Sequence, residues 1–206
     1  RQLQVSVGKL TENDIWDEIL RVQTALWLSN TVFHCPLTTF FIFSLPFISE
    51  YVILTPLMEN IIVYTDGGCS GNPGAGGWGA VIIADGKVRQ LSGGAKFTTN
   101  NRMELTAAIA VLSLIASDAA LKTRRVIVNI DSQYVKNGIT TWIKSWKAKG
   151  WLTADKKPVK NQDLWQKLDD VSANLDVNWN WVKGHAGIEY NELCDSLCKM
   201  EMAKFQ

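Results

Sequence analysis

The sequence has few of the features that mark several common classes of protein. Its net charge is only +1 at pH 7, so no overall basic charge points to a nucleic-acid partner. The four cysteines lack Cys-x-x-Cys spacing, which argues against a zinc site and fits a reducing cytoplasm better than a secreted disulfide framework. There is no internal repeat and no low-complexity run. A chain of 206 residues can still bury one full core and carry a short appendage.

A nucleotide-binding phosphate loop is also missing. Residues 67–77 are rich in glycine and follow an apolar run, but no Gly-Lys-Ser/Thr follows them. The next segment indicates a strand, whereas phosphate loops of nucleotide-binding domains lead into a helix. We therefore expect a tight glycine-rich turn between two strands, in which Gly67, Gly68 and Gly71 let a ligand backbone approach Asp66.

Charged residues are absent from residues 22–49. This run is long enough to cross a bilayer of roughly 30 Å, but three prolines (Pro36, Pro46 and Pro56) would interrupt or kink a helix in or near it. No basic cluster follows to set an orientation, and a signal peptide would place its apolar run nearer the start. Two interpretations stay open for residues 1–57. They form a membrane or docking appendage, or they are a non-native or non-functional extension ahead of a natural start at Met58.

Residues 58–206 show the periodicity of an α/β domain. Short β-branched runs predict five strands, at residues 60–65, 78–84, 87–95, 124–130 and 177–182. Apolar residues at helical spacing predict helices at residues 101–117, 132–138, 140–148, 161–173 and 188–204. The first three strands form an antiparallel meander, and later strands join through helical crossovers. We therefore expect a five-stranded mixed sheet flanked by helices.

Four acidic residues occupy positions that are poor places for unpaired charge. Asp66 and Asp131 end apolar strands, Glu104 begins an apolar helix, and Asp195 lies in the last helix. Carboxylates at the ends of buried strands are unfavourable unless a cation or hydrogen bonds satisfy them. Taken singly, each could be a helix cap or a surface charge. Together they indicate one shared metal site and a metal-dependent enzyme.

Several longer motifs then become recognisable. They are Tyr-Thr-Asp-Gly-Gly-Cys-Ser-Gly-Asn-Pro-Gly at 64–74, Thr-Thr-Asn-Asn-Arg-Met-Glu-Leu at 98–105, Asp-Ser-Gln-Tyr-Val at 131–135, Thr-Ala-Asp-Lys-Lys-Pro-Val-Lys-Asn at 153–161, and Trp-Val-Lys-Gly-His-Ala-Gly at 181–187. In this order they resemble the type 1 ribonuclease H family, and bacterial ribonuclease HI in particular. The resemblance runs from about residue 58 to about residue 203 and does not include residues 1–57.

The resemblance implies a ribonuclease H-like fold and an endonuclease that cuts the RNA strand of an RNA–DNA hybrid. The products would carry 5′-phosphate and 3′-hydroxyl ends, and two Mg²⁺ ions, or Mn²⁺ in their place, would serve the active site. By the same resemblance the metal ligands are Asp66, Glu104, Asp131 and Asp195. His185 would act near the scissile phosphate in proton transfer or product release, since imidazole exchanges protons near neutral pH.

The resemblance also implies which residues contact the hybrid. The minor groove and the 2′-hydroxyl groups would face the backbone of Gly67, Gly68 and Cys69 and the side chains of Asn72, Asn101 and Gln133. A DNA-strand phosphate would lie at Thr99 and Asn100. A basic protrusion would supply Trp142, Trp146, Lys147, Lys149, Trp151 and Lys156. Taken without the resemblance, the two asparagines at 100 and 101 could simply cap a helix, and the protrusion could be a solvated amphipathic helix.

One segment departs from the family pattern. After Ala186 and Gly187 the family often continues His-Pro-Glu-Asn, whereas this chain has Ile-Glu-Tyr-Asn at 188–191. A shift of this loop would affect Asp195 most.

Three rival functions stay open: another nuclease or polynucleotidyl transferase of the same fold, a non-catalytic hybrid-binding module, and a membrane-tethered variant using residues 22–49. A cytoplasmic monomer is the expectation for location and assembly.

Overall fold

The computed structural model describes residues 4–6, 53–55 and 59–206. The chain divides into two units, residues 1–57 and 58–206. In the first unit, β1 (Gln4–Ser6) pairs antiparallel with β2 (Ile53–Thr55). The uncharged run at 22–49 and Met58 lie outside the described residues, so the hypotheses about them stay predictions. Within the described part, no helix combines the length and the apolar character that crossing a membrane requires.

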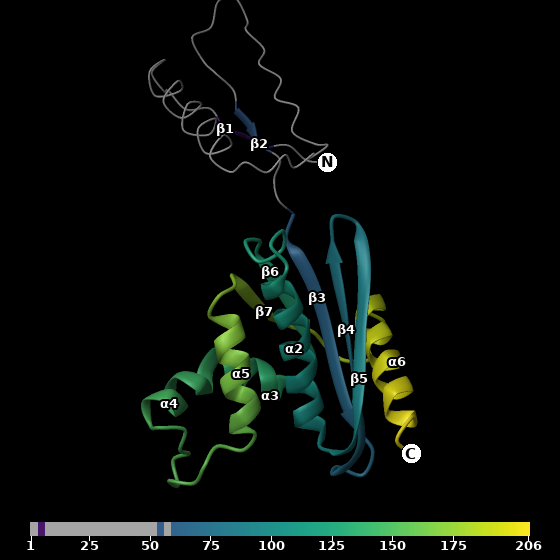
Figure 1. Ribbon diagram of the computed structural model, residues 1–206, viewed down its shortest axis with the longest axis vertical. Coiled ribbons are helices and arrows are strands. Elements are labelled where there is room, and N and C mark those ends of the chain that lie inside the picture. The colour runs from purple at the N-terminus through teal and green to yellow at the C-terminus, as the bar shows by residue number, and fades with distance from the viewer. Residues whose placement is uncertain (1–3, 7–52, 56–58) are drawn as a thin grey trace, which may run out of the picture. The chain divides into compact units, whose positions relative to one another are not determined.

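The second unit is built on a five-stranded sheet with the order β5-β4-β3-β6-β7 (Figure 1). β3 (Ile61–Cys69), β4 (Gly74–Ala84) and β5 (Lys87–Thr98) form the antiparallel meander. β6 (Val126–Ile130) and β7 (Val177–Trp181) add to it in parallel, β6 beside β3 and β7 beside β6. The predicted five-stranded mixed sheet flanked by helices is therefore confirmed.

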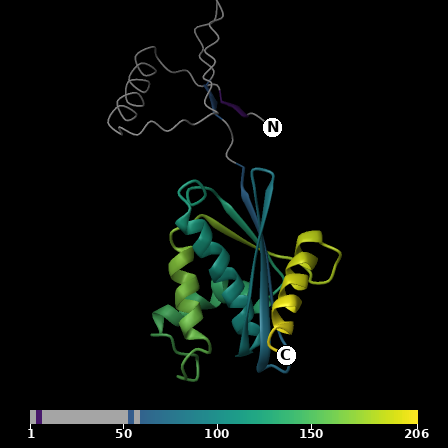
Figure 2. The same ribbon diagram turned by 45° about the vertical axis from the view of Figure 1, so that its right-hand side comes forward.

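Helices cover both faces of this sheet. α2 (Asn100–Ser117) contacts β3 and β4 and packs beside α5 (Gln162–Ser172). α6 (Glu189–Ala203) contacts β3, β4 and β5, and it lies on the side of the sheet away from α2 (Figure 2). Between β6 and α5 the chain forms α3 (Gln133–Asn137), the π-helix η1 (Gly138–Trp142) and α4 (Ile143–Ala148).

The main core lies between the sheet and the α2 and α5 helices. Successive residues of a strand point to opposite faces, and along β3 the alternate residues Ile61 and Val63 are fully buried. The apolar stripe predicted for α2 is confirmed, because Leu105, Leu112 and Ile115 are fully buried. This packing fixes α2, and with it Glu104, against the centre of the sheet.

The predicted glycine-rich turn over 67–77 is much shorter in the structure. β3 continues to Cys69 and β4 begins at Gly74, so only residues 70–73 lie outside the strands. Gly67, Gly77 and Gly79, inside the strands, are needed because α2 or α6 approaches their backbone very closely. A Cβ at Gly77 would lie 2.1 Å from the carbonyl oxygen of Cys198 on α6. Lack of a side chain, rather than freedom to turn, explains these glycines.

The two short helices predicted at 132–138 and 140–148 form one continuous helical stretch. Gly138, the last residue of the first predicted helix, has right-handed helical angles of φ −57° and ψ −56°, so the chain does not leave the helix there. A Cβ there would lie 1.9 Å from the ring of Trp165 on α5, so glycine serves close packing at this position too.

Candidate active site

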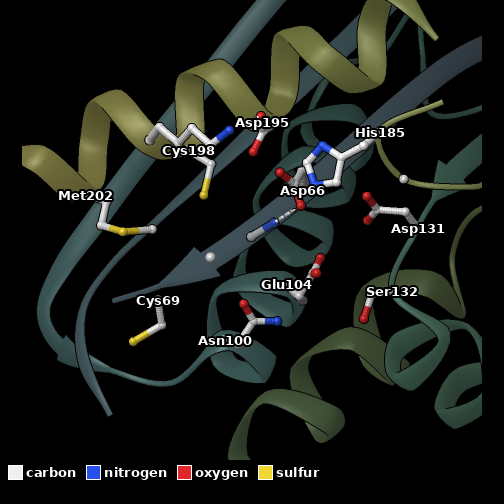
Figure 3. Close-up of a pocket in the computed structure, with 14 residues that line it drawn as sticks. Asp66, Cys69, Asn100, Glu104, Asp131, Ser132, His185, Asp195, Cys198 and Met202 are labelled. Carbon is white, nitrogen blue, oxygen red and sulfur yellow. Dashed lines mark hydrogen bonds and ion pairs between the residues drawn. The ribbon is translucent and has the colours of Figure 1, made fainter. Parts of the chain in front are cut away.

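Three of the four predicted acidic ligands meet at one end of the sheet. Asp66 belongs to β3, Asp131 directly follows β6, and Glu104 lies in the second turn of α2. Thr65 and Ile130 are register partners, so the parallel pairing of β3 with β6 places Asp66 beside Asp131, where β6 ends and β3 continues to Cys69. One carboxylate oxygen from each of the three acids lies within 4.8 Å of the others. Figure 3 shows the three side chains pointing toward a common space.

Without a cation, the ionised forms of Asp66 and Glu104 are unfavourable, and their pKa values are raised. Burial raises the pKa of Asp66 to about 6, and the charges of Asp131 and Asp195 add to the rise. Burial also raises the pKa of Glu104 well above its usual range, with further contributions from Asp66 and Asp131. The backbone N–H of Gly67 opposes both shifts, and it donates to Asp66 Oδ1 at 2.8 Å.

Of these acids, Glu104 has the environment that most clearly indicates a metal ligand. Its side chain is 5% exposed, and its Oε2 atom has no hydrogen-bond partner in the described part of the chain. A buried, unpaired carboxylate oxygen is unfavourable unless it is protonated or bound to a cation. Closely spaced hard oxygen donors suit Mg²⁺ or Mn²⁺. The residues present therefore fit a divalent ion of this kind.

Asp195 lies slightly apart from the other three acids. It lines the same cavity from α6, but its side chain groups with His185 and Glu192, and one oxygen pairs with Lys199 Nζ at 2.5 Å. The altered loop before α6 has therefore not removed Asp195 from the cavity. The charge of Asp195 contributes to the raised pKa of Asp66.

The cavity extends beyond the acids along β3 and α6. It is lined by the four acids together with Gly67, Gly68, Cys69, Asn100, Ser132, Gly184, His185, Cys198, Lys199 and Met202. His185 is exposed and has a φ of +52° in the turn that leads to α6. Figure 3 shows its ring directed toward Asp66. The predicted acids, His185 and residues 67–69 therefore surround one cavity.

Among the charged residues of this site, two were not predicted from the sequence. Glu192 Oε1 accepts a hydrogen bond from Gly187 N–H at 3.3 Å, which ties α6 to the turn that carries His185. Lys199 neutralises Asp195. Both lie one helical turn from Asp195, three residues before it and four residues after it. Helical spacing was the signal that could have identified them.

The predicted hybrid-binding residues occupy mixed environments. Asn72 is exposed, and its Oδ1 accepts from the backbone N–H of Asn100 at 3.0 Å. Thr99, which precedes α2, makes no side-chain capping bond. The start of α2 is therefore capped by Asn72 from the turn between β3 and β4. Gln133 is exposed at the start of α3, and Asn101 is partly buried.

The tryptophans of the basic protrusion pack largely against the protein itself. The Trp142 and Trp146 rings lie 5.7 Å apart, and Trp146 lies 5.4 Å from Trp165 (centroid distances). Trp142 remains 37% exposed, whereas Trp146 and Trp151 pack partly buried against the core. Core packing thus accounts for much of the aromatic content here, and contact with nucleic acid stays a prediction for all three tryptophans.

The lysines of the protrusion differ in their pairing. Lys147 Nζ lies 2.5 Å from Asp169 Oδ2 on α5, so much of its charge is already compensated. Lys149 and Lys156 are exposed, and neither makes an ion pair with the described residues. These two lysines are the more available cations for a phosphate backbone.

Comparison with known proteins agrees with this geometry. Residues 58–203 match the family model described as RNase H. A protein named Ribonuclease H from Phenylobacterium zucineum is 53% identical over 148 residues, which cover 72% of this chain and 94% of that protein. The Ribonuclease H of Paramagnetospirillum magneticum is 51% identical over 148 residues, covering 72% and 93%.

Solved structures give the same answer. The crystal structure of LC9-RNase H1, a type 1 RNase H, aligns with a TM-score of 0.65 at 29% identity, covering 74% of this chain and 76% of that one. The structure of LC11-RNase H1 in complex with an RNA/DNA hybrid aligns with a TM-score of 0.55 at 25% identity, covering 70% and 98%. By sequence, fold and site geometry, this chain belongs to the RNase H family.

Proposed function

We propose that residues 58–206 hydrolyse the RNA strand of RNA–DNA hybrids in a reaction that uses two Mg²⁺ ions and leaves 5′-phosphate and 3′-hydroxyl ends. The observation that carries this proposal is the group of three close carboxylates, in which Glu104 is buried and has an unpaired oxygen among the described residues. Its support comes from the family match and from the relatives named Ribonuclease H. The LC11-RNase H1 complex with an RNA/DNA hybrid supports the choice of substrate.

Asp66, Glu104 and Asp131 would hold the ions, and Asp195 would complete the set from α6. When bound, paired divalent ions can activate an attacking water and stabilise the leaving oxygen of an in-line displacement. The chain contributes a site in which burial and the charges of neighbouring acids raise the pKa values of Asp66 and Glu104 when no cation is present. Lys199 compensates Asp195 from the solvent side.

His185 would handle protons beside the scissile phosphate. It is exposed at the cavity edge, so its imidazole can exchange protons with water. Glu192 restrains the turn on which it sits, through the hydrogen bond from Gly187 N–H. We assign His185 a helper role, and its removal should slow turnover less than removal of Asp66.

The hybrid would lie across the cavity and the protrusion. The backbone of Gly67, Gly68 and Cys69 lines the cavity beside the acids, where it could meet the minor groove of the hybrid. Lys149 and Lys156 would attract the DNA strand.

We also propose that the protein is a cytoplasmic monomer. The free cysteines Cys69, Cys194 and Cys198 support a reducing compartment.

The test is incubation of the full chain with labelled RNA–DNA hybrid, duplex RNA and duplex DNA, with and without Mg²⁺. We expect cleavage only of the RNA in the hybrid and only with the metal. A polymerase should extend the products, and a phosphatase should remove their 5′-phosphate. Cleavage of DNA would support another nuclease of the same fold, and binding without cleavage would support a non-catalytic module. The Asp66→Asn variant controls for a contaminating nuclease.

A further inference from the structure

Asn191 connects α6 to the acidic site. It is the third residue of α6, its side chain is 2% exposed, and its Nδ2 donates to Asp131 Oδ2 at 3.2 Å. It lies in the segment 188–191, where the chain departs from the family pattern, although Asn191 itself matches that pattern. We propose that Asn191 is a positioning residue, which holds the Asp131 carboxylate in the orientation that binds a divalent cation. The inference rests on the proposed function.

The chemistry of the two groups fixes the orientation of the amide. An ionised carboxylate only accepts hydrogen bonds, and the amide oxygen of asparagine also only accepts. Reversal of the Asn191 amide would set two acceptors against each other, so Nδ2 must face Asp131. The other side-chain atom, Oδ1, is then buried without a partner among the described residues.

That unpaired oxygen argues against a purely stabilising role. A buried acceptor without a donor is unfavourable, and an apolar side chain of similar shape would avoid this penalty. Asn191 therefore lowers the stability of the fold through its unpaired Oδ1, while its Nδ2 orients Asp131. Such a compromise is typical of groups that support a functional site.

Other contacts restrain Asp131 from different directions. The indole Nε1 of Trp181 donates to the Asp131 backbone carbonyl at 3.1 Å. Gly184 packs against the carboxylate, since a Cβ there would lie 2.8 Å from Oδ2. Asn191 donates to the carboxylate itself at Oδ2, and Oδ1 makes no hydrogen bond within residues 59–206, which leaves it available to a cation.

Without Asn191, repulsion from the neighbouring acids would act on a carboxylate that has lost its hydrogen-bond donor, although Trp181 and Gly184 would still contact Asp131. Asp66 and Glu104 each have an oxygen within 4.8 Å of one from Asp131. We therefore expect that loss of the Asn191 amide lets Asp131 rotate away and weakens cation binding. Groups that orient metal ligands typically change metal affinity by about 10- to 100-fold when they are removed.

The experiment compares two substitutions at this position with a buried control. Asn191→Ala deletes the amide, and Asn191→Leu replaces it with an apolar group of similar shape. The control, Asn129→Ala, removes a buried asparagine (6% exposed) that donates to Val63 O, outside the acidic cavity. Calorimetric titration of the full chain with Mn²⁺, without nucleic acid, measures binding directly, and denaturant unfolding measures stability.

We expect Asn191→Leu to unfold at the same denaturant concentration as the wild type or higher, and to bind Mn²⁺ about tenfold more weakly. Asn191→Ala should weaken binding similarly, and Asn129→Ala should change it less than twofold. Lower stability of Asn191→Leu with unchanged Mn²⁺ affinity would overturn the inference, because it would make Asn191 a structural residue. If the wild type neither binds Mn²⁺ nor cleaves the hybrid, the proposed function itself fails. Failure of this inference alone leaves both wild-type properties intact.

Discussion

The α-carbon of Gly67 on β3 lies directly against the backbone of Glu104 on α2. A Cβ at Gly67 would lie 2.3 Å from the Glu104 nitrogen and 2.5 Å from the Met103 carbonyl carbon. Since Asp66 precedes Gly67, this contact determines how closely two of the carboxylates approach each other. The glycine after Asp66 therefore has a geometric role in building the site, beside any contact with substrate.

Substitution Gly67→Ala should damage both the fold and the site. Overpacking typically destabilises by about 1–3 kcal/mol, and backbone atoms cannot yield as side chains do, so we expect about 3 kcal/mol. A Cβ at 2.3 Å from backbone must displace α2 by about 1 Å to reach ordinary contact, and this should lower the rate of hybrid cleavage about 100-fold. Denaturant unfolding and steady-state cleavage assays measure the two effects.

Gly68→Ala is the matched control for stability. A Cβ at Gly68 would meet only Cys198 Sγ and Met202 Cε, both at 3.0 Å. Met202 is flexible and can move, so this substitution should destabilise less than Gly67→Ala. Equal losses of stability would mean that the approach of α2 does not depend on Gly67.

The metal-free protein should lose stability as the pH rises. The pKa of Asp66 is about 6 in the folded chain against 3.8 as the ordinary value, so the folded state holds a proton that the unfolded state has released. Stability therefore falls between about pH 4 and pH 6 and stays low above that, by about 2–3 kcal/mol. The raised pKa of Glu104 acts in the same direction. Unfolding with a chelator present, at pH 5 and pH 8, measures the part of this fall above pH 5, which is about 1.4 kcal/mol for Asp66.

Asp66→Asn isolates this effect from other groups. Arg102 lowers the pKa of Asp163, so that pair loses stability only at lower pH, below the window compared. In the variant the difference between pH 5 and pH 8 should shrink, and Mg²⁺ should stabilise the wild type more at pH 8 than at pH 5. A wild type that is more stable at pH 8 without metal would contradict the arrangement of acids described above.

The sequence predicted the sheet and the main acids because both depend on local pattern. Apolar runs that lead to Asp66 and Asp131 predict two strands, and the parallel pairing of these strands brings the two acids together. The predicted strand end before Asp66 was wrong, because β3 continues to Cys69. The short turn at 70–73 and the capping bond from Asn72 could not be predicted this way. Both depend on distances between elements far apart in sequence. The role of Asn191 escaped for the same reason, since its partner lies 60 residues away.

Asn72 should stabilise the fold by capping α2, and it should contact the hybrid from the turn at 70–73. Asn72→Ala removes the acceptor for Asn100 N–H and should destabilise by about 1 kcal/mol. Asn72→Asp keeps an acceptor at a helix N-terminus, so its stability should match the wild type. The added negative charge should nevertheless weaken hybrid binding, which fluorescence anisotropy would measure. Hybrid affinity unchanged in Asn72→Asp would place Asn72 outside the binding surface.

The basic protrusion should bind the hybrid through its charge, and Lys149 and Lys156 should contribute more to this binding than Lys147. Each lysine that neutralises a phosphate changes the slope of log binding constant against log salt by about 0.7–0.9. Replacing Lys149 and Lys156 together with glutamine should reduce this slope by about 1.5, with little change in single-turnover cleavage of saturating hybrid. Lys147→Gln should change it less, because Asp169 already pairs with Lys147.

The matched control is Lys122→Gln, which replaces an exposed lysine in the turn after α2. A salt slope that the double substitution leaves unaltered would show that the protrusion does not bind the DNA strand.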